Sequence, residues 1–161
     1  MHEILIADAG PLIALARIER LYMLPRLFRR TLTTDIVWAE CLANPTEQER
    51  TQLLLAHEHD WLGVVMTPIP SNPWRLGAGE VSALTLALER GSAVLIDDRA
   101  ARRTAIKLGL AVIGVVGVLT LAKRKGLIDV IHPDLDHLAS TGYHLAPALL
   151  IQALRQVNES P

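Results

Sequence analysis

The sequence predicts an α/β fold, a three-layer α/β/α sandwich around a mainly parallel central sheet. Short apolar runs such as residues 4–7 and 93–96 are too brief for helices, and they alternate with longer segments whose apolar residues recur at helical spacing. Strands that alternate with helices form a parallel sheet covered on both faces. The length of 161 residues corresponds to one domain. We therefore expect residues 1–161 to form a single domain that includes helices in residues 131–161.

Composition excludes several classes of protein. Half of the residues are apolar and a fifth are charged, which excludes an intrinsically disordered chain. No apolar run approaches the ~20 residues that span a bilayer, and the first residues carry no basic leader. The single cysteine, Cys41, excludes an internal disulfide and a cysteine zinc site. These features predict a soluble cytoplasmic protein, and its net charge of −1 does not by itself indicate a nucleic-acid partner.

The first half of the chain is expected to begin with a strand over residues 4–7, because a four-residue apolar run fits a strand buried on both faces. Pro11 suits the first turn of the helix that follows, up to residue 21. Asp35 is expected to cap a helix that runs to Leu42. The same patterns predict a short helix over residues 21–28, a strand over 32–34 and a helix over 46–59.

In the second half, three prolines within residues 68–73 indicate a loop. Gly79 and Glu80 begin a helix that Gly91 closes. The remaining elements are predicted by short apolar runs and by helical spacing: strands over residues 64–66, 93–96 and 111–113, and helices over 99–108, 115–125, 134–140 and 147–157.

Carboxylates follow two of the expected strands directly. Asp8 comes after residues 4–7, and Asp97 and Asp98 come after Ile96. The carboxyl ends of neighbouring parallel strands meet at one rim of a sheet, which is where ligands bind in such folds. Glu80 lies in the first turn of a helix, and Glu40 lies within an apolar helix.

Carboxylates that converge on one rim repel one another unless protons or cations compensate them. Oxygen ligands alone select hard ions such as Mg²⁺ or Mn²⁺ over zinc. Such an ion activates water and stabilises an in-line attack on phosphate. The five acids therefore predict a metal site for phosphodiester chemistry.

Each acid also has an ordinary structural explanation. Glu80 is expected at a helix N-terminus, where the macrodipole stabilises a negative charge. Asp8 or Asp97 alone suits a loop cap, and Glu40 suits an ion pair with an arginine. A receiver-like phosphoacceptor is a rival site, although the sequence places no lysine at a late strand end.

Five segments together resemble one family, the PIN domain, in its VapC-like branch. Four of them resemble its four acidic motifs in order, and the fifth resembles the tail of the branch: Asp8-Ala9-Gly10-Pro11-Leu12-Ile13, Val37-Trp38-Ala39-Glu40, Gly77-Ala78-Gly79-Glu80-Val81-Ser82-Ala83-Leu84, Leu95-Ile96-Asp97-Asp98-Arg99-Ala100-Ala101-Arg102, and Gly142-Tyr143-His144-Leu145-Ala146-Pro147.

This resemblance implies a metal-dependent endoribonuclease that cleaves single-stranded RNA, usually the toxin of a toxin–antitoxin pair. It implies Mg²⁺ or Mn²⁺ held by the acids of the motifs, an antitoxin protein as partner and a homodimer. Many relatives carry Ser or Thr where this chain has Gly10. A catalytically weak or inactive PIN-fold binding module is therefore the alternative. The acids that the resemblance implies as catalytic residues and metal ligands are Asp8, Glu40, Glu80, Asp97 and Asp98.

Two surfaces are predicted to take part in binding. Arg99, Arg102 and Arg103 share one helical face beside the acids, where they suit RNA phosphates, although a solvated face explains them equally well. The high apolar content predicts a covered surface, with the helices around residues 12–24 and 53–59 as candidates for the dimer contact.

Overall fold

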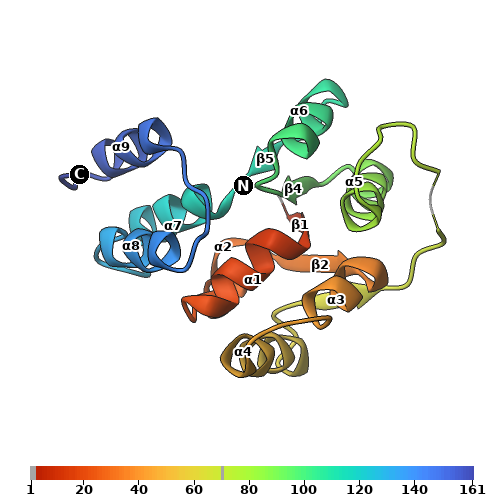
Figure 1. Ribbon diagram of the computed structural model, residues 1–161, viewed down its shortest axis with the longest axis horizontal. Helices are drawn as coiled ribbons and strands as arrows, with labels where there is room; N and C mark the ends of the chain where they lie inside the picture. The colour runs from red at the N-terminus through yellow and green to blue at the C-terminus, as the bar shows by residue number, and fades with distance from the viewer. Residues whose placement is uncertain (1–2, 70) are drawn as a thin grey trace.

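The computed structural model describes residues 3–69 and 71–161. Within them, five strands form one sheet in the order β3-β2-β1-β4-β5, and every pair of neighbours is parallel (Figure 1). The predicted α/β fold with a parallel sheet is confirmed. The strands are β1 (Ile4–Ala7), β2 (Arg30–Thr34), β3 (Gly63–Val65), β4 (Ala93–Leu95) and β5 (Val112–Ile113).

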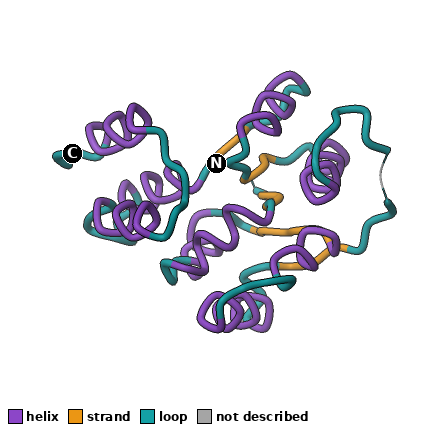
Figure 2. The backbone as a smooth tube through the Cα atoms, viewed as in Figure 1, coloured by secondary structure: helices purple, strands orange, loops and turns teal. Residues whose placement is uncertain are grey.

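Helices surround these short strands, as the tube in Figure 2 shows. They match the predicted ranges closely, except that the helix predicted over residues 21–28 is divided into a 3₁₀ turn, Leu21–Met23, and a short helix, α2 (Leu24–Leu27). The other helices are α1 (Ala9–Arg17), α3 (Asp35–Cys41), α4 (Glu47–Glu58), α5 (Ala78–Arg90), α6 (Arg99–Lys107), α7 (Val115–Arg124), α8 (His132–Ser140) and α9 (Pro147–Gln156).

The N-terminus of α3 corrects one prediction. Thr34, and not Asp35, caps this helix, because the Thr34 Oγ1 accepts a hydrogen bond from the Val37 amide at 3.0 Å. The Asp35 carboxylate instead accepts two hydrogen bonds, from the amide and from the hydroxyl of Thr67, both at 2.9 Å. The capping residue is therefore the last residue of β2, and Asp35 fastens the segment that follows β3.

The chain changes direction across the sheet between β1 and β4. From β1 it proceeds outward to β2 and β3, and from β4 it proceeds to β5 on the opposite side. Ala7 is aligned with Leu95, and the Asp8 amide donates a hydrogen bond to the Leu95 carbonyl at 2.9 Å. In parallel α/β sheets such a switch point opens a crevice at the carboxyl ends of the strands. Asp8 and the acids after β4 therefore begin at this crevice.

The central strands form the core of the molecule. Leu5 and Ile6 of β1 and Val94 and Leu95 of β4 are completely buried, so helices cover both faces of the sheet. The C-terminal helix reaches the same core, since Leu154 of α9 belongs to it. The organisation as one domain stays a prediction. None of the described helices is long and apolar enough to cross a membrane.

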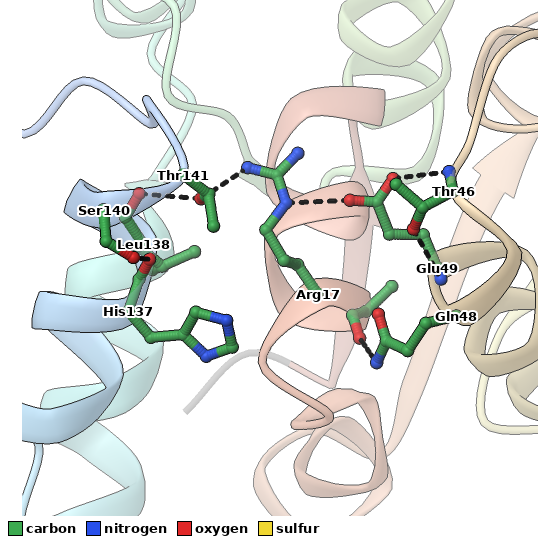
Figure 3. A network of polar contacts seen from close by, with 9 residues as sticks. Arg17, Thr46, Gln48, Glu49, His137, Leu138, Ser140 and Thr141 are labelled. Atoms are coloured by element: carbon green, nitrogen blue, oxygen red, sulfur yellow. Dashed lines mark hydrogen bonds and ion pairs between the residues drawn. The ribbon is translucent and has the colours of Figure 1, made fainter.

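A polar network ties α1 to elements far away in the sequence (Figure 3). The Arg17 guanidinium donates to Glu49 of α4 at 2.8 Å and to the hydroxyl of Thr141, just after α8, at 2.9 Å. Gln48 donates to the Ala16 carbonyl at 3.1 Å. These contacts place the segment between α8 and α9 next to α1, which starts at the carboxyl end of β1.

Candidate active site

Asp8 is the most enclosed acid of the rim. It is only 6% exposed, and its Oδ1 is buried without a hydrogen-bond partner among the described residues. Burial, opposed by a hydrogen bond from Ala9 and reinforced by repulsion from Glu80, Glu40 and Asp98, raises the pKa of Asp8 to about 7. The charges of Glu80, Glu40 and Asp98 therefore all act on the Asp8 carboxylate.

Glu80 has two different oxygen environments at the N-terminus of α5. Its Oε1 accepts a hydrogen bond from the Gly77 amide at 3.1 Å, which is the helix-terminal role that its position predicts. Its Oε2 is buried without a partner in the described structure. Burial and repulsion from Asp98 raise the pKa of Glu80, although the Gly77 amide opposes this. The helix cap therefore uses only one of the two carboxylate oxygens of Glu80.

Glu40 approaches Glu80 from the last turn of α3. The residue is exposed, although its helix is apolar, and its Oε1 accepts a hydrogen bond from the Gly79 amide at 3.0 Å. This approach requires glycine at position 79, because a Cβ there would lie 2.6 Å from Glu40 Oε1. Gly79 thus allows the carboxylate of α3 to lie directly against the first turn of α5.

The two aspartates after β4 diverge. Asp98 caps α6, with its Oδ2 accepting from the Ala101 amide at 3.0 Å, and it is the one that raises the pKa of Asp8 and Glu80 by repulsion. Asp97 is directed toward α7 instead, where its Oδ2 accepts from the Val115 amide at 3.3 Å. Burial raises the pKa of Asp97. Asp98 belongs to the group of Asp8, Glu40 and Glu80, and Asp97 lies at its margin.

Tyr143 is a site residue that sequence reasoning missed. It lies between α8 and α9, and its hydroxyl donates a hydrogen bond to Asp97 Oδ2. Burial and the neighbouring charges of Asp97 and Asp8 raise the pKa of Tyr143, so the hydroxyl keeps its proton and remains a donor. Only the likeness of residues 142–147 to the tail of a known family drew attention to this position, because nothing else in the sequence relates it to Asp97.

The three predicted arginines differ in their surroundings. Arg102 is half-buried and donates a hydrogen bond to the Ile96 carbonyl at 2.8 Å. Arg99 and Arg103 are exposed. Arg99 and Arg102 line a groove together with Asp97, whereas Arg103 does not border it. The shared helical face therefore divides into a pair beside the acids and one arginine outside the groove.

Two other side chains of types that can bind a metal, Cys41 and His57, make different contacts. Cys41 is buried, and burial together with the charges of Asp8 and Glu40 raises the pKa of its thiol to about 12, so it stays protonated. The His57 ring contacts Trp38, and its Nδ1 lies 3.1 Å from the Leu62 carbonyl. Neither residue joins the acids as a metal ligand.

The four-acid group formed by Asp8, Glu40, Glu80 and Asp98 has the chemistry of a hard-cation site. All of its donors are carboxylate oxygens, and two of those oxygens, Asp8 Oδ1 and Glu80 Oε2, are buried and unpaired in the part of the chain that is described. No three acidic, histidine or cysteine side chains in residues 3–69 and 71–161 are already gathered as a finished ligand set. A cation would therefore have to draw these carboxylates inward from their backbone partners.

Comparison with known proteins gives two findings. The family model described as a PIN domain matches residues 4–159. Among solved structures, a PilT N-terminus domain protein from the hyperthermophilic archaeon Sulfolobus solfataricus P2 is similar over 71% of this chain and 89% of its own, with 12% sequence identity and a TM-score of 0.46. No curated protein matches the chain.

Proposed function

The chain belongs to the PIN-domain family, and on that premise we propose that it is a metal-dependent endoribonuclease that cleaves single-stranded RNA. Proteins of this family are generally nucleases, and their nucleases generally use divalent metals. The fold is therefore a nuclease fold. The choice of RNA, of Mg²⁺ or Mn²⁺ and of an internal phosphodiester belongs to the proposal.

One observation carries the proposal. The acids of the four-acid group come from four separate parts of the chain, and the switch point of the sheet brings them into mutual repulsion. Such repulsion destabilises the fold unless protons or a cation compensate it, so it supports a cation-binding role for the group once its acids are ionised. Structural roles explain one oxygen each of Glu80 and Asp98, but they leave Asp8 Oδ1 and Glu80 Oε2 unexplained.

The residues divide the work as follows. Asp8, Glu40, Glu80 and Asp98 would hold Mg²⁺ or Mn²⁺, and the bound ion would supply an activated water and stabilise the charge on the phosphate. Asp8 and Glu80 must lose their protons to bind it, because burial and repulsion hold their pKa values high. Tyr143 and the Val115 amide fix the Asp97 carboxylate at the margin of the group. Arg102 lies beside Asp97, where its charge suits an RNA phosphate.

The cellular role that we propose is that of a toxin held in check by an antitoxin protein. Its support is the resemblance of the acidic motifs and of residues 142–147 to the VapC-like branch. Gly10 departs from that branch, and a Cβ at this position would meet nothing within 4 Å. A serine therefore fits at position 10 without displacing a neighbour, and we propose that the missing hydroxyl lowers activity without altering the fold.

Substitution of Glu80 tests the activity. Glu80→Gln keeps the size of the side chain and still accepts from the Gly77 amide, but it removes a charged metal ligand. We expect the rate of Mn²⁺-dependent cleavage of single-stranded RNA to fall by ~10²-fold or more, because a lost ligand weakens both water activation and charge stabilisation. Glu89→Gln, an exposed change on the same helix, is the control and should cleave at the wild-type rate.

Two outcomes would decide against the proposal. If Glu80→Gln cleaves RNA as fast as the wild type, Glu80 serves only to cap α5. If the wild-type chain, freed of any partner, cleaves no RNA with either metal, the binding-module alternative replaces the nuclease. In the nuclease, Gly10→Ser should increase the rate.

A further inference from the structure

A groove beside the acidic rim has the composition of a nucleotide site. It has a volume of about 480 Å³, within the ~300–1,000 Å³ range of small-ligand sites. Its walls come from the start of α6, the edge strand β5, the start of α7 and the segment that leads into α9. Asp97 lies in its wall, so the groove opens directly from the margin of the proposed active site.

The polar part of the groove holds two arginines, Arg99 and Arg102, against one carboxylate, Asp97. Arg99, Arg102 and His144 line it, and neither arginine forms a salt bridge with any described carboxylate. The hydrogen bond from Arg102 Nη1 to the Ile96 carbonyl anchors that guanidinium and leaves its other N–H groups available. Guanidinium groups bind phosphate oxygens in a planar, bidentate manner. This part of the groove therefore suits a phosphate.

The remaining wall is apolar and partly open. Val116 and Leu149 lie in it. Leu149 is 48% exposed although it is a large hydrophobic residue, whereas Val116 is 5% exposed and lies mostly beneath the surface. The backbone of Gly114 and Gly117 forms another part of the same wall. An unstacked base has two apolar faces that such a surface can cover, whereas a base inside a duplex is covered by its neighbours.

We propose that this groove binds the nucleotide next to the cleaved bond of a single-stranded RNA, with its phosphate on Arg99 and Arg102 and its base against Leu149. The proposal rests on the proposed function, because it names the substrate contacts of that same site. In this proposal, the preference for unpaired RNA comes from the groove. The proposal also predicts weak sequence preference, since an apolar wall accepts any base.

RNA binding without cleavage tests the groove. The probe is a short fluorescent oligouridylate, and anisotropy is measured in EDTA so that no metal-dependent cleavage occurs. We expect Arg99→Gln to weaken binding about tenfold and to reduce the slope of log affinity against log salt by about 1. Leu149→Asp should weaken binding to a similar extent, because it places a negative charge on the wall that receives the nucleotide.

Matched controls separate the groove from general charge and hydrophobicity. Arg103→Gln removes the same charge from the same helix outside the groove, and Ile151→Asp changes another exposed hydrophobic residue of α9. Both should bind RNA within about twofold of the wild type. Circular dichroism and thermal melting would show that all four variants fold. Equal losses for Arg99→Gln and Arg103→Gln, or wild-type binding by Leu149→Asp, would overturn the proposal.

The binding test is independent of the nuclease test. If cleavage depends on Glu80 but Arg99→Gln and Leu149→Asp bind RNA like the wild type, only the groove proposal is wrong. If RNA binds through the groove but the chain cleaves nothing, only the proposed activity is wrong. A wild-type chain that binds no RNA would contradict the groove proposal directly, as would duplex RNA that competes as well as single-stranded RNA.

Discussion

At the scale of single residues, Asp8 combines a cost in stability with a proposed role in binding metal. Its carboxylate is buried at the end of β1 beside Glu80, Glu40 and Asp98, with one oxygen unpaired in the described structure. A charge in such a place is unfavourable until a cation compensates it. In the proposed metal site, Asp8 would therefore be a ligand that destabilises the metal-free protein.

The pH dependence of stability should report on Asp8. Its pKa is 3.8 in the unfolded chain and about 7 in the folded one, so the folded state keeps its proton longer. The free energy of unfolding in metal-free buffer should therefore fall as the pH rises from about 4 to about 7, by on the order of 4 kcal/mol. Asp8→Asn should remove most of this decrease and melt at a higher temperature than the wild type at pH 8.

The same variant should lose metal affinity. Calorimetry with Mn²⁺ should show binding by the wild type and none by Asp8→Asn. For the pH dependence of stability, Asp35→Asn serves as the control. The hydrogen bonds from Thr67 lower the pKa of Asp35, so the charge of Asp35 stabilises the fold. That variant should be less stable than the wild type at neutral pH. Equal Mn²⁺ affinity of wild type and Asp8→Asn would contradict the metal site.

Gly79 offers a second test at this scale. Gly79→Ala places a Cβ where the Glu40 carboxylate now lies, so Glu40 must move away from the N-terminus of α5. We expect about a tenfold loss of Mn²⁺ affinity, comparable to the loss caused by disturbing an outer contact of a metal site. Gly10→Ala is the matched control, because a Cβ there meets open space. Equal affinities of the two variants would show that the position of Glu40 is unimportant for the metal.

At the scale of elements, the site depends on where helices begin. The N-termini of α5, α6 and α7 each direct backbone amides at a rim carboxylate, through Gly79, Ala101 and Val115. Helix N-termini carry partial positive charge and free N–H donors, so they hold carboxylates in place without neutralising the whole group. The acids are thereby oriented by backbone, and a cation can still compete for their free oxygens.

The C-terminal end of the chain is fastened in part by one carboxylate, Glu159. Glu159 accepts hydrogen bonds from Lys123 Nζ at 2.7 Å and from the amides of Ile131 and His132 at 2.8 and 3.0 Å. These donors lower the pKa of Glu159, although burial opposes them. The contact joins the residues after α9 to α7 and to the start of α8.

Removal of this charge should destabilise the protein. We expect Glu159→Gln to lower the free energy of unfolding at pH 7 by about 2 kcal/mol and the melting temperature by about 5 °C. Because the folded pKa is lowered, the wild-type contribution is present above pH 4.5 and disappears as the pH falls through the folded pKa. The difference between the two proteins should therefore shrink in acid. Glu58→Gln, an exposed change on α4, should melt like the wild type.

At the scale of the whole molecule, the homodimer and its two candidate surfaces, around residues 12–24 and 53–59, stay predictions. Leu12, Leu15 and Leu24 of the first segment are completely buried in the core. Of the second candidate, residues 53–59, Leu53 is buried as well and Leu54 is 40% exposed. Two hydrophobic side chains after β3 have larger exposed fractions: Met66 is 80% exposed and Ile69 is 93% exposed. An apolar surface of this kind favours a contact between chains.

Light scattering at micromolar concentration should show a dimer. Met66→Ser with Ile69→Ser should shift the protein to a monomer without lowering its melting temperature in dilute solution, because neither side chain lies in the core. Leu54→Ser is the control on the other candidate surface. A wild-type protein that scatters as a monomer throughout this range would contradict the dimer.

The sequence by itself determined the fold class and the acidic residues. Short apolar runs and helical spacing are local properties, so they predicted a parallel sheet and nearly every element, and the rule that ligands bind at strand ends selected Asp8, Asp97 and Asp98. The sequence was less informative where two neighbouring residues suit the same structural role, as Thr34 and Asp35 do at the N-cap of α3.

Only the tertiary structure decided how the acids divide. Asp97 and Asp98 are adjacent in the chain, but backbone amides of different helices hold them apart, at α7 and α6. The contact of Tyr143 with Asp97 and the approach of Glu40 to Gly79 join residues that are 46 and 39 positions apart. Such contacts depend on how helices pack across the sheet, and that packing is not written in the spacing of residues along any one segment.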